Sequence, residues 1–164
     1  MRSVQAKRIQ SPEPMDALRN EAEMPRFVMI KDMGKLTTLA RNNESLNVNF
    51  LGSQQVKDGI ICDVYKFTDD DSCDLGVVSV SAGSVTPRQK ILTGDRTIEG
   101  FMKGQGTLKV THPDGGKTEH HFPGNVNEVE LHVGDIMQWE ANTDLTFYEI
   151  CFPKYKDGRF QNLD

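Results

Sequence analysis

Short segments in which hydrophobic and polar residues alternate make up most of the sequence after residue 26. An alternation with a period of two is typical of strands with one buried face, and these segments are rich in Val, Ile, Phe and Thr. Turn-forming residues separate them, as in the stretches Pro-Asp-Gly-Gly at 113–116 and Gly-Asp at 134–135. The predicted strands are residues 27–30, 46–52, 60–67, 75–83, 100–112, 117–122, 127–133, 135–139 and 144–152.

No long segment has the spacing of an amphipathic helix, so the pattern predicts an all-β fold. Many short strands at regular intervals favour a sandwich or a closed barrel, because both arrangements leave few strand edges open to aggregation. The pattern alone does not choose between the two.

The first 25 residues differ from the rest of the chain, because three prolines interrupt them and no strand pattern is present. Ser11 and Pro12 are typical of a helix start, so this segment contains at most one short helix. We interpret residues 1–25 as an N-terminal arm and residues 26–164 as a single domain. The arm is either a loosely docked extension or a segment that crosses to a second subunit.

The chain carries 19 Lys and Arg against 24 Asp and Glu, a net charge of −5, which argues against a nucleic-acid partner. The three cysteines are odd in number and lack CxxC spacing, so neither a disulfide framework nor a zinc site is indicated. No run of about eighteen apolar residues predicts a membrane span, and the N-terminus lacks the apolar core of a signal peptide. We therefore expect a cytoplasmic protein that binds neither nucleic acid nor membrane.

Two segments, residues 97–106 and 134–149, resemble the two motifs of the cupin family. The first ends in the family's glycine at Gly104, and the second begins with the family's Gly-Asp turn at Gly134. The resemblance implies a double-stranded β-helix, which is a jelly-roll barrel, and with the flanking strands it covers about two thirds of the chain.

Most of the family's signature residues between these glycines are replaced. The glutamate ligand of the first motif falls on Thr97, and the histidine of the second falls on Leu145. The first motif's two histidines fall on Lys90 and Leu92 or, in a register one residue shorter, on Ile91 and Thr93. Because none of these side chains is a usual metal ligand, the resemblance implies a barrel without a metal, without another cofactor and without redox chemistry.

Side chains two apart in a strand share a face, so Leu145 in the interior would bring Phe147, Glu149 and Cys151 with it. By the same argument Thr97 would be accompanied by Glu99 and Phe101, and Lys90 and Leu92 would face the same interior. An unpaired charge there is costly, so Lys90 should pair with Glu99 or Glu149 or meet solvent at the barrel mouth. The candidate ligand-binding residues are Lys90, Thr97, Glu99, Trp139 and Glu149.

Each candidate also has a structural interpretation. The charged residues could form a structural ion pair in a filled barrel, and Trp139 could be a core residue instead of a stacking surface for a sugar ring. Histidines near one hairpin could make a non-standard metal site or simply lie at the surface, and a run of acids from 69 to 74 is typical of a solvated turn. These histidines are His112, His120 and His121, and a fourth, His132, stands alone.

Two functions remain open. The first is a metal-independent domain that binds a small polar ligand of carbohydrate or carboxylate type in the barrel. The second is a sugar or nucleotide-sugar isomerase or epimerase that uses carboxylate and lysine groups for acid-base catalysis. Cupins commonly pair through an edge strand, so we also expect a homodimer.

The C-terminal segment, residues 151–164, is predicted to dock on the outside of the barrel through Tyr155, Phe160 and Leu163. Alternatively, Lys154 and Arg159 could hold an anionic ligand near the barrel mouth.

The replaced ligand positions lead to a first prediction. The purified protein should contain no stoichiometric zinc, iron, nickel or manganese, because Thr97 and Leu145 supply neither of the expected donors. Elemental analysis of the untagged protein tests this. About one equivalent of any of these metals per chain would contradict it.

Overall fold

The computed structural model describes residues 34–164, and these form two antiparallel sheets. The predicted arm, residues 1–25, and the predicted strand at 27–30 lie outside the described residues. Among the described residues, no helix is long and apolar enough to cross a membrane. The strands are β1 (Thr38–Arg41), β2 (Glu44–Lys57), β3 (Ile60–Phe67), β4 (Asp74–Val80), β5 (Gln89–Ile91), β6 (Arg96–Lys103), β7 (Gly106–Thr111), β8 (Lys117–Phe122), β9 (Glu128–Leu131), β10 (Ile136–Ala141), β11 (Leu145–Phe152) and β12 (Phe160–Asn162).

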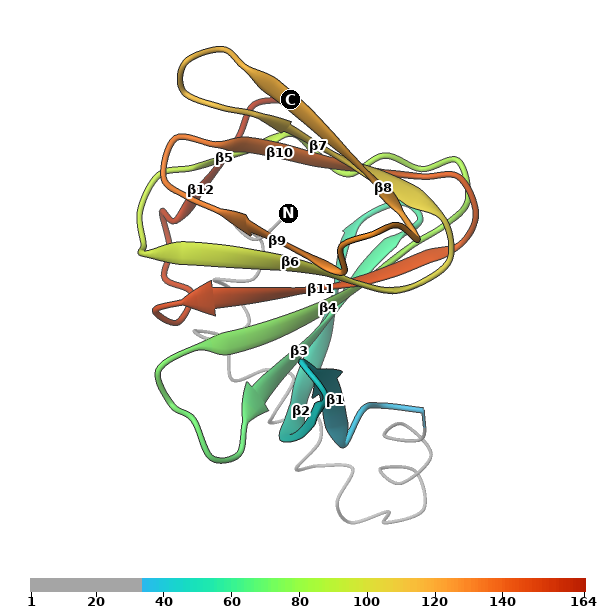
Figure 1. Ribbon diagram of the computed structural model, residues 1–164. Helices are drawn as coiled ribbons and strands as arrows, with labels where there is room; N and C mark the ends of the chain where they lie inside the picture. The colour runs from blue at the N-terminus through green and yellow to red at the C-terminus, as the bar shows by residue number, and fades with distance from the viewer. Residues whose placement is uncertain (1–33) are drawn as a thin grey trace.

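The seven-stranded sheet has the order β1-β2-β3-β4-β11-β6-β9, and the five-stranded sheet has the order β12-β5-β10-β7-β8. The two sheets face each other and enclose the barrel, while β1 and the first part of β2 lie at the edge of the larger sheet, below the barrel in Figure 1. The all-β jelly-roll barrel predicted from the sequence is therefore confirmed.

The strand pattern of the sequence matches most of the observed strands. The predicted strands 60–67 and 117–122 agree with β3 and β8 at both ends. The predicted strand 100–112 is two strands, because the chain turns at Gly104 between β6 and β7. Gly104 has a φ of 95°, a conformation that favours glycine, and an added Cβ would lie 2.0 Å from the Asp144 carbonyl oxygen. Three short strands, β1, β5 and β12, were not predicted.

The barrel interior is filled by stacked aromatic side chains. Trp139 is fully buried and stacks on Phe147, with ring centroids 4.4 Å apart. The ring centroid of Phe122 lies 5.3 Å from that of Trp139, and Phe101 stacks on Phe122 with centroids 5.5 Å apart. Stacked rings of this size dominate the packing of a core, so Trp139 is a core residue and not a surface for a sugar ring.

The seven-stranded sheet also buries its other face. In β11, Phe147 faces the barrel whereas Tyr148 and Ile150 contribute to a second cluster with Leu75 and Ile98 on the opposite side. The β1–β2 hairpin supplies Leu39 and Val48 to this second cluster and so covers it. The central strands therefore read as nearly continuous apolar runs, as expected for strands that are buried on both faces.

The C-terminal segment docks, but not on the outside of the barrel as predicted. Residues 160–162 form β12, which pairs with β5 and places Phe160 opposite Ile91. Phe160 and Tyr155 consequently belong to the main core, where their rings stack at 6.0 Å. The prediction was wrong about the location because it did not recognise a strand as short as β12.

The docked segment leads to a second prediction. Phe160→Ala should lower the free energy of unfolding by about 3–5 kcal/mol, the usual cost of removing a buried phenylalanine ring. Denaturant unfolding measures this loss. Gln161→Ala is the control, because Gln161 is exposed in the same strand and its replacement should cost less than about 0.5 kcal/mol. Equal effects of the two substitutions would show that Phe160 does not pack in the core.

Candidate functional site

Two carboxyl groups meet inside the barrel. Glu99 in β6 and Glu149 in β11 lie directly opposite each other in the strand pairing, and both are fully buried. The indole Nε1 of Trp139 donates a hydrogen bond to Glu99 Oε2 at 3.0 Å. Thr97, Glu99, Trp139 and Glu149 are thus brought together in the interior, as the strand alternation predicts. The stacked rings beside them leave this group enclosed by side chains.

Lys90 is not part of this group, so the expectation that it faces the interior was wrong. In β5 the buried residues are Gln89 and Ile91, while Lys90 is half-buried between them. Its partner in β10 is Ile136, whereas Gln89 pairs with the buried Met137. This register turns Lys90 to the outer face, and Leu92 is likewise exposed. The lysine and carboxylate pair expected for an isomerase is therefore not assembled.

The family's metal-ligand positions do not supply a ligand set. Thr97 and Leu145 both lie in the interior. Of the residues that the two registers place at the histidine positions, Ile91 is the one in β5 that is buried. Apolar side chains and a single hydroxyl do not match the several N or O donors that a divalent metal needs. Within residues 34–164, no group of three or more His, Cys, Asp or Glu side chains is arranged to hold a metal ion.

Arg159 has a structural place and not the ligand-binding one considered from the sequence. Its side chain is buried and lies flat against Gly94. Its Nη2 donates to the carbonyl oxygens of Arg96 and Phe152 and to Thr97 Oγ1, and its Nη1 donates to the Pro153 carbonyl oxygen, at distances of 2.7–3.2 Å. These bonds tie the C-terminal segment to the start of β6 and the end of β11. Lys154 pairs instead with Asp71 on the surface.

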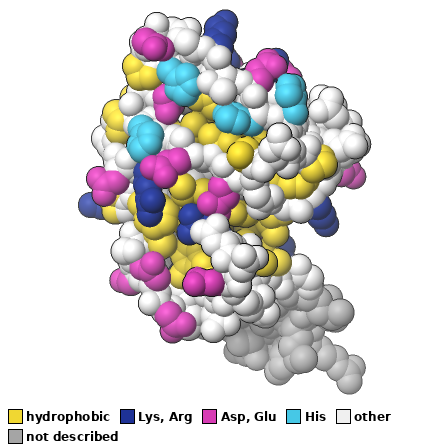
Figure 2. Space-filling view, viewed as in Figure 1, with side chains coloured by type: hydrophobic (Ala, Val, Ile, Leu, Met, Phe, Trp, Pro, Cys, Tyr) yellow, Lys and Arg dark blue, Asp and Glu magenta, His cyan; other side chains and the backbone are white. Residues whose placement is uncertain are grey.

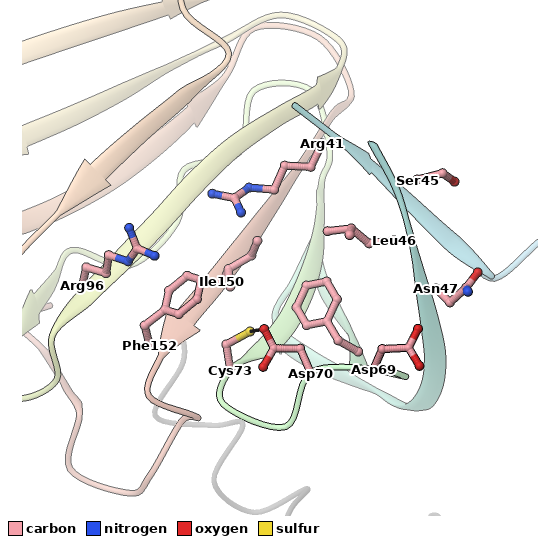
Figure 3. A pocket seen from close by; sticks show the side chains of 11 residues that line it. Arg41, Ser45, Leu46, Asn47, Asp69, Asp70, Cys73, Arg96, Ile150 and Phe152 are labelled. Carbon is pink, nitrogen blue, oxygen red and sulfur yellow. Dashed lines mark hydrogen bonds between the residues drawn. The ribbon is translucent and has the colours of Figure 1, made fainter. Parts of the chain in front are cut away.

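A cavity of about 500 Å³ lies outside the barrel, on the second face of the seven-stranded sheet. We call it the outer hollow. In Figure 2 hydrophobic surface is visible in this region between basic and acidic side chains, and Figure 3 shows the cavity from close by. It is lined by Arg41, Ser45, Leu46, Asn47, Phe67, Asp69, Asp70, Cys73, Arg96, Ile150 and Phe152.

The outer hollow has an apolar floor and charged sides. Ile150 and Phe152 from β11 form part of the floor, and the guanidinium of Arg96 lies over the Phe152 ring at 4.3 Å from its centroid. Arg96 is about half exposed, and its ion pair with Glu130 is loose, at 3.8 Å. Asp69 and Asp70 lie on the other side of the floor (Figure 3). Arg96 is thus a cation that remains available to a bound anion.

Arg41 is fixed at the edge of the outer hollow by a hydrogen-bond network. Its Nε and Nη2 donate to the two carboxylate oxygens of Glu128 at 2.6 and 3.1 Å, and the Tyr148 hydroxyl donates to the same carboxylate. Burial opposes ionisation of Glu128, but the hydrogen bonds from Arg41 and Tyr148 and the charges of Arg41 and Arg96 outweigh it and lower its pKa. Burial and then Glu128 raise the pKa of Tyr148, which stays an uncharged donor. The network joins β1 to β9, the two edge strands of the sheet.

The thiol in the outer hollow is not a reactive group. Burial, followed by the charge and hydrogen bond of Asp70, raises the pKa of Cys73 to about 11. The hydroxyl and the backbone N–H of Ser72 bind Asp70 and lower its pKa, so this carboxylate stays charged beside the thiol. Because the thiolate is the nucleophilic form, the outer hollow is suited to binding and not to covalent chemistry at Cys73.

The histidines lie where a surface hairpin would place them. His120 is half-buried and the adjacent His121 is exposed, so the two project to opposite faces of β8. The side chain of His132 is largely exposed and contacts Glu130. His112 hydrogen-bonds Asp135 and Thr118.

The outer hollow was not predicted from the sequence. Arg41 and Arg96 lie in segments that carry no motif, and the acidic run at 69–74 was interpreted only as a solvated turn. The apolar positions 148 and 150, which alternate with the barrel-facing residues of the same strand, were the available signal for a second buried face.

No protein-family model and no curated protein sequence matches the chain. Solved structures do match it. Oxalate decarboxylase from Lactobacillus farciminis, in a formate complex, has a TM-score of 0.58 at 9% identity, over 68% of this chain and 33% of that one. The capsular polysaccharide assembling protein CapF from Staphylococcus aureus has a TM-score of 0.56 at 15% identity, over 71% of this chain and 32% of that one. Streptomyces PAC13 with uridine has a TM-score of 0.52 at 13% identity, over 69% of this chain and 84% of that one. The chain spans about a third of the length of the first two proteins.

The network at Glu128 leads to a third prediction. Glu128→Gln should destabilise the fold at pH 7 by about 1–3 kcal/mol, because it removes a half-buried charged acceptor shared by two donors. A carboxyl group with a lowered pKa stabilises the folded state above its unfolded pKa, about 4.3, and this contribution is lost as the pH falls through the folded pKa. The difference between wild type and variant should therefore shrink in acid.

Denaturant unfolding from pH 7 down to pH 3 measures the difference. The control is Glu44→Gln, because Glu44 is exposed at the start of β2 and its replacement should have little effect at any pH. A deficit of Glu128→Gln that stays constant with pH would show that the charge of Glu128 does not contribute.

Proposed function

We propose that this chain, which has a cupin fold, is a ligand-binding domain. Its ligand would be a small carboxylate or an acidic carbohydrate, bound without a metal. The observation that carries the proposal is the outer hollow, an apolar-floored cavity of about 500 Å³ beside an available arginine. Cavities of about 300–1,000 Å³ with apolar walls and a few placed polar groups are typical of small-molecule sites.

The ligand's acidic group would bind Arg96. A guanidinium presents two parallel N–H groups that match a carboxylate, and Arg96 already lies over Phe152, which limits its conformations. The apolar part or ring face of the ligand would pack on Ile150 and Phe152. Hydroxyl groups on the far side of the ligand could donate to Asp69 or Asp70.

The outer hollow is favoured over the barrel interior because of how the interior is filled. Trp139 and Phe147 stack at its centre, and a ligand there would have to displace them. Solved structures with this fold include oxalate decarboxylase with formate and PAC13 with uridine, so small ligands are compatible with the fold. The shared fold does not indicate which ligand this chain binds.

The fourth prediction tests the site. A panel of carboxylates such as benzoate, glucuronate and gluconate is compared with the neutral analogues benzyl alcohol and glucose by calorimetry. An acidic member of the panel should bind wild type. Arg96→Ala should weaken it by about ten- to a hundredfold, since hydrogen bonds to charged groups contribute about 1.5–3 kcal/mol. Arg96→Lys should restore part of the affinity, because lysine keeps the charge but loses the planar fork.

The matched control is Arg88→Ala. Arg88 is as exposed as Arg96 and also pairs with a carboxylate, Asp164, but it lies away from the outer hollow. Its replacement should leave the affinity unchanged. If Arg96→Ala binds normally while Glu149→Gln does not, the ligand lies in the barrel and the proposed location is wrong.

A further inference from the structure

A hydroxyl, an imidazole and a carboxylate are aligned at the hairpin between β7 and β8, away from the outer hollow. Asp135 Oδ1 lies 3.0 Å from Nδ1 of His112, and Thr118 Oγ1 lies 2.8 Å from Nε2 of the same ring. The three residues come from different segments: Asp135 from the turn before β10, His112 from the turn after β7, and Thr118 from β8.

The two contacts determine where the proton of the His112 ring lies. A carboxylate oxygen accepts hydrogen bonds, so Nδ1 of His112 carries the hydrogen and donates it to Asp135. Nε2 then has a free lone pair and accepts the hydrogen of the Thr118 hydroxyl. This is the arrangement in which an imidazole removes a proton from a hydroxyl nucleophile while a carboxylate orients the ring.

Burial within the group suits this chemistry. The side chain of Asp135 is only 8% exposed and is fixed further by the backbone N–H of His132, which donates to Oδ2 at 2.9 Å. The side chain of His112 is 39% exposed, and Thr118 is half-buried. A reagent in solution can therefore reach the His112 ring, and Thr118 next to it is not fully buried, whereas the orienting carboxylate is held in place.

His120 is on the same strand as Thr118. It is two residues from Thr118 in β8, so both side chains project from the same face of the strand. Burial, followed by the charges of His112 and His121, lowers the pKa of His120. This shift favours the neutral ring, which retains an N–H group that can donate to negative charge on this face of the strand. In Figure 2 histidine side chains gather on the upper half of the visible face.

We propose that Thr118, His112 and Asp135 form a second site, which transfers acyl groups from small carboxylic esters to Thr118 and then to water. The Thr118 oxygen bonds to the ester carbonyl carbon as its proton moves to His112 Nε2. The bond from that carbon to the alcohol oxygen then breaks, and the alcohol leaves with the proton from His112. Water next gives a proton to His112 and adds to the acyl carbon. Thr118 leaves with that proton, and the net products are a carboxylic acid and an alcohol.

The experiment uses p-nitrophenyl acetate with the full chain. Wild type should release p-nitrophenol, and intact-mass and peptide mass spectrometry should find one acetyl group on Thr118. Thr118→Val, of nearly the same shape, should abolish that label. Thr118→Ser should react faster, because serine lacks the methyl group that crowds the oxygen. His112→Asn keeps an N–H donor for Asp135 but removes the base, so it should slow acylation about a hundredfold.

Two controls separate this site from general surface reactivity. Thr146→Val removes a half-buried strand hydroxyl elsewhere, and Thr38→Val removes an exposed strand hydroxyl, so both variants should react like wild type. Thermal unfolding shows whether each variant is folded. If Thr118→Val does not fold, Thr118→Ser still tests the site. An acetyl group found only on lysines, or equal rates for wild type, His112→Asn and Thr118→Ser, would overturn the proposal.

Discussion

The seven-stranded sheet must cover two apolar faces, and this requirement determines the arrangement of the rest of the described chain. One face of β4 and β11 closes the barrel against the five-stranded sheet, and the other needs a separate cover. The β1–β2 hairpin provides that cover, and Arg41 and Glu128 join the two edge strands of the sheet across it. The outer hollow lies where this cover ends, with residues of the hairpin on one side and residues of β6 and β11 on the other. The proposed ligand site is thus a consequence of how far the cover extends.

The fold was largely predictable because strand alternation and turn residues are local signals. Strands β3 and β8 alternate clearly and were located to the residue. Two of the three strands that were missed, β5 and β12, have three residues each, too few to establish a period. They exist because β12 pairs with β5 and β5 pairs with β10. Their positions are set by tertiary contacts that no short window of sequence contains.

The site was less predictable, and the errors share a cause. Thr97, Glu99 and Glu149 were correctly placed in the interior because each lies in a long strand with a clear inward neighbour. Lys90 was misplaced because the position of β5 relative to β10 depends on pairing register, and a shift of one residue reverses the face. The outer hollow combines residues from β1, β2, β3, β6, β11 and the loop after β3, and nothing in any one of these segments indicates the others.

The pairing of β12 with β5 has a consequence for how the protein is made. Residues 89–91 and 160–162 must meet before the five-stranded sheet is complete, and Phe160 and Tyr155 must arrive before the barrel core is filled. During synthesis the apolar interior would stay partly open until these late residues have left the ribosome. A nascent chain in that condition exposes apolar surface that chaperones bind, so this barrel cannot fold completely before residues 155–162 are available.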